Sequence, residues 1–398
     1  MTRPARPLKV AIIAGEPSGD RLGADLLAAL KMRHPDGVEI IGVGGDAMIG
    51  EGLSSLFDYS ELSIVGVSAV LARLPQLVWR IGQTARAIAA ARPDILVIID
   101  SPDFSHRVAR KVRRRLPDLP IVNYVCPTVW AWKPHRARRM VGYIDHVLSI
   151  LPFEPRIVEA LGGPPTTYVG HRLALDPDLL SARIEQDERA KAGLSTGLCL
   201  VLPGSRRSEL KRLMPVFAEA VAEMAGRHPG MRFVLPAVPR HVETIRNAVA
   251  GWPVAPDIVI GEEAKWRAFA EADGALAASG TVLLELALAG VPCVSAYKLD
   301  PVAKLLTHLI ITWSAALPNL IVGYPVLPEY MNESARPGRL ARHVERLMLP
   351  TLERAAMLEG FETVRRAMAV GRPPGEYAAE IIDDLLARRR QGTGVLGL

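Results

Sequence analysis

The sequence predicts an α/β protein made of two doubly wound domains, and three observations lead to this prediction. Short apolar runs of strand length alternate with longer runs of helical periodicity, which is typical of parallel strands joined by helical crossovers. The alternation starts again after residue 197. The chain has 398 residues, which is more than one ordinary hydrophobic core serves. We therefore expect two successive domains that face a cleft, with the ligand at the carboxyl ends of the strands.

The first series of elements lies before residue 180, where a charged segment predicts the domain boundary. Each expected strand is followed by a segment of helix length, which favours right-handed crossovers and a parallel sheet. The expected strands span residues 8–14, 38–43, 95–99, 121–125 and 146–150, and the expected helices span residues 21–32, 74–91, 104–116 and 133–142.

The second series repeats this pattern and ends in helices alone. Its expected strands span residues 198–202, 232–235, 258–260, 274–277 and 293–296, and its expected helices span residues 208–227, 239–249, 266–272, 282–289, 301–311, 339–348, 352–369 and 376–390. Pro373 and Pro374 separate the last two helices. We expect an N-terminal domain over residues 1–180 and a C-terminal domain over residues 181–372. A final helix within residues 373–398 is expected to pack on the N-terminal domain or on a partner subunit.

The composition excludes several classes of protein. Hydrophobic residues make up 49% of the chain, which argues against extensive disorder. Cys126, Cys199 and Cys293 lack the spacing of a metal site, and so few cysteines are typical of a reducing compartment. The apolar run after the basic N-terminus is too short for a signal sequence, and no run is suited to span a bilayer. We expect a soluble cytoplasmic protein with no metal and no cofactor.

The net charge of +6, from 48 basic and 42 acidic residues, fits three kinds of partner. These are nucleic acid, an anionic membrane surface and a phosphorylated substrate, and solvated helix faces explain the same excess. Basic and aromatic residues do not interleave on one element, so we expect no nucleic acid partner.

Two loops in the second half predict a pocket for a nucleotide diphosphate. Each follows a strand and opens a helix, where unpaired backbone N–H groups and the helix dipole favour a negative group. Arg206 adds a planar cation that can bind phosphate oxygens, and Glu285 lies one helical turn after Thr281, where it can accept hydrogen bonds from a ribose. The residues expected to line this pocket are Ser205, Arg206, Ser279, Gly280, Thr281 and Glu285.

The loop at residues 15–20 follows the first expected strand. Its glycine spacing does not match the dinucleotide-binding pattern, and Glu16 and Asp20 would repel a pyrophosphate. The loop is better suited to hydroxyl-rich or cationic groups. Alternatively, Ser18 or Asp20 caps the helix that follows.

Asp100 and Asp103 follow the expected strand at residues 95–99. A carboxylate at the carboxyl end of a strand faces the cleft in this architecture, so Asp100 is the candidate general base for an attacking hydroxyl. Glu16 and Asp20 are second choices. The alternative for Asp100 and Asp103 is a helix cap or a loop hydrogen bond.

For the residues in three further segments, the sequence leaves the role open. Trp130 and Trp132 lie in one loop, where they pack on the core or line an apolar acceptor. His171 contacts a phosphate or is a hydrogen-bonded histidine between domains. Asn319 lies between a proline turn and an apolar run, where its amide could read a base or a sugar.

Residues 59–80 are rich in Leu, Ile and Val with interspersed arginines, yet too short and too interrupted to span a membrane. An amphipathic element that lies on a membrane or holds acyl chains has this pattern. A helix and lid packed on the core has it as well. The basic run at residues 110–115 could sit against anionic lipid headgroups.

Taken together, these motifs resemble the lipid-A-disaccharide synthase family, inverting glycosyltransferases of the GT-B type with two Rossmann-like domains. The resemblance runs nearly end to end, and the motifs occur in the same order. They lie at residues 15–20, 42–45, 54–57, 99–104, 130–132, 168–171, 202–209, 278–285 and 317–320.

The resemblance implies a donor, UDP-2,3-diacylglucosamine, and an acceptor, 2,3-diacylglucosamine 1-phosphate (lipid X). The products would be the β-1,6-linked disaccharide 1-phosphate of lipid A and UDP, formed without a metal. It also implies a peripheral location on the inner leaflet of the bacterial cytoplasmic membrane, and a homodimer is a further expected partner. The UDP site falls on the C-terminal motifs together with Asn319, and the acceptor and catalytic groups fall on Glu16, Ser18, Asp20, Asp100 and Asp103.

Two other functions compete with this expectation. A UDP-sugar epimerase on the same architecture needs no lipid acceptor, so the apolar segment at residues 59–80 and the paired tryptophans speak against it. A non-catalytic protein that binds a sugar nucleotide or a lipid would not need Asp100, Glu16 and Arg206 together.

Overall fold

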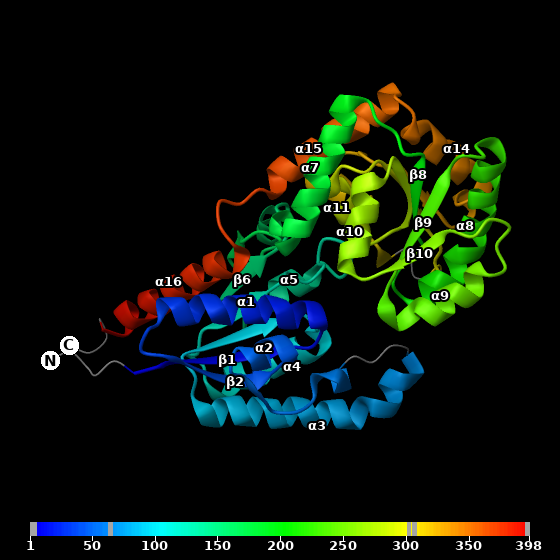
Figure 1. The fold of residues 1–398 in the computed structure, drawn as a ribbon. Helices are drawn as coiled ribbons and strands as arrows, with labels where there is room; N and C mark the ends of the chain where they lie inside the picture. Colours follow the sequence, from blue (N-terminus) through cyan, green and yellow to red (C-terminus); the bar gives the residue numbers. More distant parts are fainter. Residues whose placement is uncertain (1–5, 63–66, 301–303, 305–308, 395–398) are drawn as a thin grey trace. The chain divides into compact units, whose positions relative to one another are not determined.

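The structure is a computed structural model that describes residues 6–62, 67–300, 304 and 309–394. The chain divides into two compact units, shown in Figure 1. Unit 1 comprises Met1–His171 together with Val370–Leu398, and unit 2 comprises Arg172–Ala369. The first division therefore follows His171, whereas the boundary expected near residue 180 falls inside a helix.

Unit 1 is built on one sheet of parallel strands with helices on both faces. The strands are β1 (Leu8–Ala14), β2 (Val38–Val43), β3 (Ser54–Ser55), β4 (Ile95–Ile99), β5 (Ile121–Tyr124), β6 (His146–Ser149) and β7 (Thr166–Tyr168). The helices are α1 (Pro17–Arg33), α2 (Asp46–Gly50), α3 (Val67–Ala91), α4 (Pro102–Arg115), α5 (His135–Met140), α6 (Glu154–Ala160) and α16 (Pro374–Gly394). The strand order is β3-β2-β1-β4-β5-β6-β7.

The two faces of this sheet are buried by different helices, because successive residues of a strand point to opposite sides. Ala11 and Ile13 of β1 belong to the core shared with α3 and α4. Val10 and Ile12 belong to the core shared with α1 and α16. The strands are thus apolar on both faces, as expected for an all-parallel sheet.

The last helix of the chain belongs to unit 1. Figure 1 shows α16 lying along α1, and the two helices are in extensive contact. Ile382 is fully buried between them, and Asp383 pairs with Arg33 at 2.5 Å and with His34 at 2.8 Å. α16 therefore completes one face of the first sheet.

Unit 2 repeats the same arrangement. Its strands are β8 (Leu198–Leu202), β9 (Arg232–Ala237), β10 (Asp257–Ile260), β11 (Gly274–Ala278), β12 (Cys293–Tyr297) and β13 (Glu329–Met331). Its helices are α7 (Pro177–Ala192), α8 (Arg207–Arg227), α9 (Val242–Val249), α10 (Glu262–Glu271), α11 (Thr281–Ala289), α13 (Leu317–Val322), α14 (Pro337–Met348) and α15 (Leu352–Met368). The parallel strands follow the order β10-β9-β8-β11-β12-β13. The helix expected at residues 301–311 falls mostly outside the described residues.

In each sheet the direction of strand addition reverses beside the first strand. β1 lies between β2 and β4, and β8 lies between β9 and β11. The carboxyl ends of the two strands at such a reversal are where open α/β sheets bind ligands. The doubly wound α/β class predicted for both halves of the chain is confirmed.

Candidate active site

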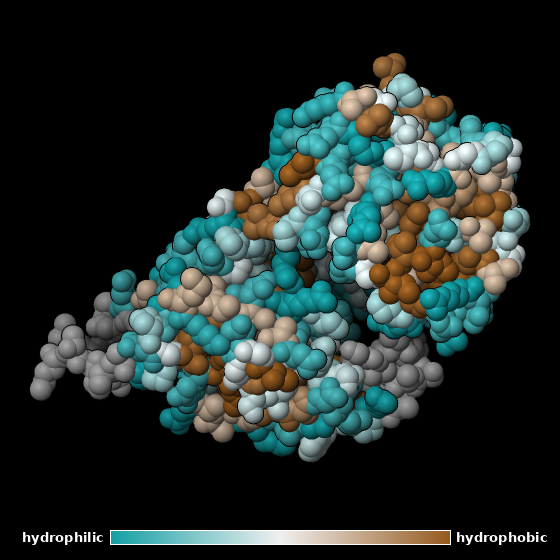
Figure 2. Space-filling view, viewed as in Figure 1, coloured by the Kyte–Doolittle hydropathy of each residue, from teal (hydrophilic) through white to brown (hydrophobic). Residues whose placement is uncertain are grey.

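A pocket of about 460 Å³ opens in unit 2 at the carboxyl ends of β8 and β11. These strands are neighbours in the sheet, so two loops that are far apart in sequence lie side by side. Figure 2 shows apolar surface where β9 and β10 lie, and the loop after β9 adds an apolar wall to the pocket. The polar lining includes every residue that the sequence predicted for the nucleotide pocket apart from Asn319: Ser205, Arg206, Ser279, Gly280, Thr281 and Glu285.

The start of α11 forms the polar end of this pocket. Gly280 is the residue before the helix, and its φ of 154° favours glycine. No side chain in the described part of the protein caps α11. Its first backbone N–H groups are therefore available to an acceptor in the pocket, where the helix dipole favours negative charge.

The start of α8 differs because a side chain caps it. The buried carboxylate of Glu209 accepts hydrogen bonds from the backbone N–H groups of Ser205 at 3.1 Å and Arg206 at 3.2 Å. It also accepts one from the Arg206 guanidinium at 2.9 Å. Glu209 thus engages the two backbone N–H groups that precede α8, and a phosphate at this helix start stays a prediction. The Arg206 side chain is 74% exposed and lines the pocket.

Glu285 forms an ion pair with Lys265 of α10 at 3.0 Å inside the pocket. Burial raises the pKa of the Glu285 carboxyl, and the charge of Lys265 opposes that shift. Lys265 also lies over the ring of Trp266 at 4.1 Å, which holds the ammonium group in place. The sequence analysis missed Lys265. Its position at the start of a helix after a strand was the signal available.

Asn319 is buried and hydrogen-bonded within unit 2. Its amide donates to the carbonyl oxygen of Leu327 and to Glu329, both at 3.1 Å. Its carbonyl oxygen accepts from the backbone N–H of Val326 at 2.8 Å and of Leu327 at 3.0 Å. These bonds use the full capacity of the amide, so Asn319 fixes the loop before β13 and does not read a base or a sugar.

In unit 1, β4 is followed by two consecutive residues with left-handed backbone. Asp100 has a φ of 58° and Ser101 a φ of 44°. Such conformations at non-glycine residues cost about 1 kcal/mol each and cluster at functional sites. The Ser18 hydroxyl donates to the Asp100 carboxylate at 3.4 Å. Burial raises the pKa of Asp100, and hydrogen bonds from Ser101 and Ser18 oppose the shift.

The loop after β1 approaches Asp100 because Gly15 has no side chain. A Cβ atom at Gly15 would collide with the side chain of Ser101. Glu16 is the residue that precedes α1, two positions before Ser18. The loops after β1 and β4 therefore bring Glu16, Ser18 and Asp100 to one edge of the sheet.

Asp20 does not join this group. It is buried, and its carboxylate accepts hydrogen bonds from the backbone N–H groups of Gly45 at 2.7 Å, Ala47 at 2.9 Å and Met48 at 3.3 Å. The carboxylate thus caps α2, which makes Asp20 a structural residue and a poor candidate for a base. Asp103 has a side chain that is 86% exposed and lies 3.8 Å from Arg136.

The two tryptophans of the loop after β5 have different environments. The Trp130 indole donates to Glu154 at 3.1 Å and packs edge-on against Phe153. Trp132 is 37% exposed, with the Lys133 ammonium 3.9 Å from the centre of its ring. Trp130 is therefore a packing residue, and Trp132 is available to a ligand.

His171 is half-buried at the end of unit 1. The described residues hold no cluster of His, Cys, Asp and Glu that is suited to a metal ion.

The fold places the protein in a structural class. Its structure is similar to the S. aureus MnaA–UDP co-structure, with a TM-score of 0.60, 12% identity and 94% of each chain covered. It is also similar to Acinetobacter baumannii MurG, with a TM-score of 0.57, 14% identity and coverage of 95% of this chain and 100% of that chain. Two doubly wound units of this kind define the GT-B fold.

The family is shown by the sequence. The family model of lipid-A-disaccharide synthetase matches residues 10–367. The lipid-A-disaccharide synthase of Nitrobacter winogradskyi is 48% identical over 384 residues, with 96% of each chain covered. That of Bradyrhizobium diazoefficiens is 46% identical over 386 residues, with coverage of 96% of this chain and 97% of the relative. The chain belongs to the lipid-A-disaccharide synthase family and is a glycosyltransferase, and the epimerase and the non-catalytic binding protein are not favoured.

Burial of the Glu154 carboxyl predicts how the stability of the protein depends on pH. Burial raises its pKa to about 8, so the folded protein binds a proton that the unfolded chain releases near its ordinary pKa of 4.5. The free energy of unfolding should therefore fall as the pH rises between these two values. Glu154→Gln imitates the protonated form and should become more stable than the wild type as the pH rises from 5 to 8.5. Thermal midpoints at both pH values test this, and a difference that does not change with pH would contradict it.

Proposed function

We propose that this protein transfers the 2,3-diacylglucosaminyl group of UDP-2,3-diacylglucosamine to the 6-hydroxyl of 2,3-diacylglucosamine 1-phosphate (lipid X). The 6-oxygen forms the new β-1,6 bond, the bond between the anomeric carbon and UDP breaks, and the hydroxyl proton passes to a base. The observation that carries the proposal is the nucleotide-sized pocket at the start of α11. Family membership names the reaction, and the fold is one that includes a structure solved with UDP.

The pocket of unit 2 suits the UDP part of the donor. Its uncapped helix start and the exposed guanidinium of Arg206 offer hydrogen-bond donors and positive charge to a pyrophosphate. Glu285 offers a carboxylate one helical turn away, where the ribose hydroxyls would donate to it, and Lys265 holds that carboxylate in position. The apolar wall formed by the loop after β9 provides a surface for the base.

Asp100 is the proposed general base. It is mostly buried, its backbone is held in an unusual conformation, and its raised pKa makes it a stronger base than an exposed carboxylate. Ser18 orients it, and Glu16 is the second candidate on the adjacent loop. Asp20 is set aside because its carboxylate is occupied by α2.

The leaving UDP gains negative charge as the bond to the sugar breaks. The N–H groups at Gly280 and Thr281 and the guanidinium of Arg206 would stabilise that charge more in the transition state than in the ground state. No metal ion is needed in this account, because the donors on the protein supply the neutralising interactions.

We propose that unit 1 contacts the inner leaflet of the cytoplasmic membrane through α3. Among the described residues, no helix is long and apolar enough to cross a membrane. Leu74, Val78 and Trp79 are 42%, 51% and 55% exposed. Leu74 and Val78 are one turn apart and share a side of α3, and Trp79 follows Val78. Arg73 is exposed beside them. An apolar side with a tryptophan and a cation is typical of a helix that lies on an anionic membrane.

The reaction is tested by incubating the purified protein with both diacyl sugars and EDTA. Mass spectrometry should detect the tetraacyl disaccharide 1-phosphate and UDP in equal amounts. Conversion of the UDP sugar without the acceptor, or no disaccharide from folded protein, would contradict the proposal.

Asp100→Asn should reduce turnover by at least ~100-fold, because the variant has no base at the acceptor hydroxyl. Affinity for UDP, measured by calorimetry, should be unchanged. The thermal midpoint should not fall, since asparagine tolerates the left-handed backbone and removes a buried charge. Turnover near that of the wild type would eliminate Asp100 as the base.

Arg206→Ala should weaken UDP binding by about 10-fold, the effect expected of one charge-assisted hydrogen bond to phosphate. Arg207→Ala is the matched control, because Arg207 is the next residue and does not line the pocket. Calorimetric titration with UDP compares the two. Equal affinities in both variants would exclude the phosphate assignment of Arg206.

Leu74→Glu combined with Val78→Glu should lower binding to vesicles of anionic phospholipid by at least about 10-fold, because both changes place a negative charge on the apolar side of α3. Met32→Glu is the control for an added charge, since Met32 is 82% exposed on another helix of unit 1. Vesicle co-sedimentation measures the effect. Undiminished binding by the double variant would remove α3 from the membrane contact.

A further inference from the structure

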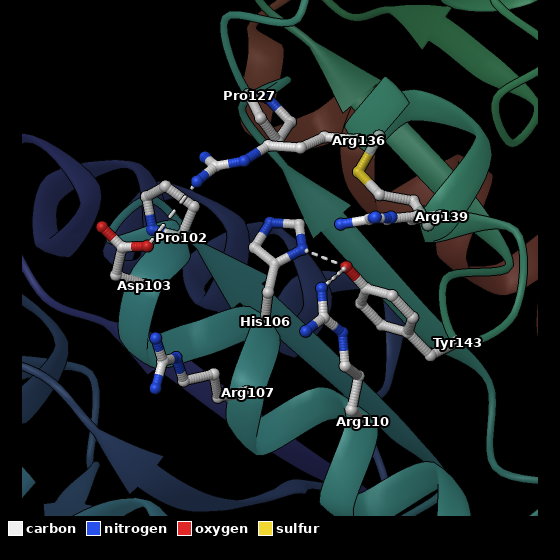
Figure 3. Close-up of a pocket in the computed structure, with 10 residues that line it drawn as sticks. Pro102, Asp103, His106, Arg107, Arg110, Pro127, Arg136, Arg139 and Tyr143 are labelled. Carbon is white, nitrogen blue, oxygen red and sulfur yellow. Dashed lines mark hydrogen bonds and ion pairs between the residues drawn. The ribbon is translucent and has the colours of Figure 1, made fainter. Parts of the chain in front are cut away.

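A second cavity, of about 180 Å³, lies in unit 1 between α4 and α5 (Figure 3). The residues from α4 recur at helical spacing and so share one side of that helix. The other wall comes from α5 and the turn that follows it. The polar and charged residues that line the cavity are Asp103, His106, Arg107, Arg110, Arg136, Arg139 and Tyr143.

The charge of this cavity is unbalanced, with four arginines against one aspartate. Asp103 reaches Arg136 only at 3.8 Å and is itself mostly exposed. Arg110 donates to the Tyr143 hydroxyl at 3.2 Å, which is a neutral partner. Within the described part of the chain, neither Arg107 nor Arg139 forms an ion pair. Cations held together without counter-charges repel one another, so the arrangement favours a bound anion.

Figure 3 shows Arg110 and Arg139 directed toward His106 and Tyr143, whereas Arg136 extends past His106 toward Asp103. His106 is buried, and its Nδ1 atom lies 3.0 Å from the Tyr143 hydroxyl. Burial, together with the charges of Arg110 and Arg136, lowers the pKa of His106 to about 3. The ring is therefore neutral at physiological pH. It provides a polar wall beside the guanidinium groups of the arginines.

The cavity lies beside the proposed base. Asp100 directly follows β4, and Pro102 and Asp103 at the start of α4 line the cavity. Pro127, after the neighbouring β5, lines it as well. In a glucosamine 1-phosphate, the phosphate on C1 and the hydroxymethyl group on C5 are attached to the two carbons that flank the ring oxygen. A sugar that presents its 6-hydroxyl to Asp100 therefore carries its phosphate only a short distance away.

We propose that this cavity binds the phosphomonoester of the acceptor, with Arg110, Arg136 and Arg139 as the residues that select a phosphorylated sugar. The proposal rests on the proposed function and names the part of unit 1 that recognises one substrate. It is separate from the nucleotide pocket of unit 2, which is larger and holds a carboxylate and a lysine. Three guanidinium groups suit a phosphate with a charge near −2, because each can donate two parallel N–H bonds.

The test compares two acceptors, 2,3-diacylglucosamine 1-phosphate and the same sugar without the phosphate. Wild-type protein should prefer the phosphorylated acceptor by at least about 10-fold in kcat/KM. Arg139→Gln and Arg136→Gln should each lose most of that preference through a higher acceptor KM, with the KM of the UDP sugar unchanged. Arg138→Gln is the matched control, because Arg138 is also exposed on α5 and does not line the cavity. It should keep the preference.

A direct binding measurement distinguishes failure of the phosphate site from failure of the proposed function. Phosphorus NMR titration with glucosamine 1-phosphate should show binding to wild-type protein and to Arg138→Gln, and weaker binding to Arg139→Gln. This result would support the site even if no disaccharide forms. If disaccharide forms and all variants keep the preference for the phosphorylated acceptor, the site is refuted while the transferase stands. If Arg139→Gln instead loses binding to anionic vesicles with its preference intact, the arginines bind lipid headgroups and the proposal is overturned.

Discussion

Both candidate sites depend on one constraint, which is the reversal of strand order beside β1 and beside β8. The reversal makes β1 a neighbour of β4 and β8 a neighbour of β11, although long segments separate them in sequence. The loops after these strands consequently meet at one edge of each sheet. Without this pairing, Ser18 would not reach Asp100, and the start of α11 would not share a pocket with Arg206. The hydrophobic strands thus determine the chemistry by deciding which polar loops become neighbours.

The two units share one topology, but the groups at their strand reversals differ in electrostatic character. In unit 1, the reversal holds a carboxylate on a left-handed backbone, where burial favours its protonated form. In unit 2, it holds an uncapped helix start and an exposed guanidinium, which favour negative charge. Under the proposed function, the carboxylate of unit 1 accepts a proton and the groups of unit 2 stabilise an anion, which are the two roles that glycosyl transfer to a hydroxyl requires. The proposed phosphate cavity beside α4 would give unit 1 an anion site as well, next to the proposed base.

The sequence predicted the long apolar elements well, because their periodicity reflects burial directly. β1, β2, β4 and β8 have the expected bounds. It missed β3, β7 and β13, which are too short to show a period, and α7, whose apolar side contains few residues among many charges. The pair Asp176 and Pro177 was the available signal for α7, since it supplies a cap and a first-turn proline.

The roles assigned to Asp20 and Asn319 from the sequence were wrong for one physical reason. A local motif does not show hydrogen-bond partners that are distant in sequence. Asp20 was taken as a possible base because it lies in a polar loop after a strand, yet its partners are the backbone groups of Gly45 and Ala47. Asn319 was assigned to ligand contact for the same reason. Glu209 is the exception, because its spacing from Arg206 is that of a local cap and could have been recognised.

The return of α16 to unit 1 has a consequence for biosynthesis. Unit 2 is inserted between the first strands of unit 1 and the helix that covers one face of them. During translation, the apolar residues of α1 and β1 that α16 will bury emerge long before α16 itself does. The nascent chain must therefore complete an entire second domain while this surface is still open to water and to other chains. The order in which the ribosome delivers the parts therefore leaves this apolar surface exposed for longer than in a domain built from one continuous segment.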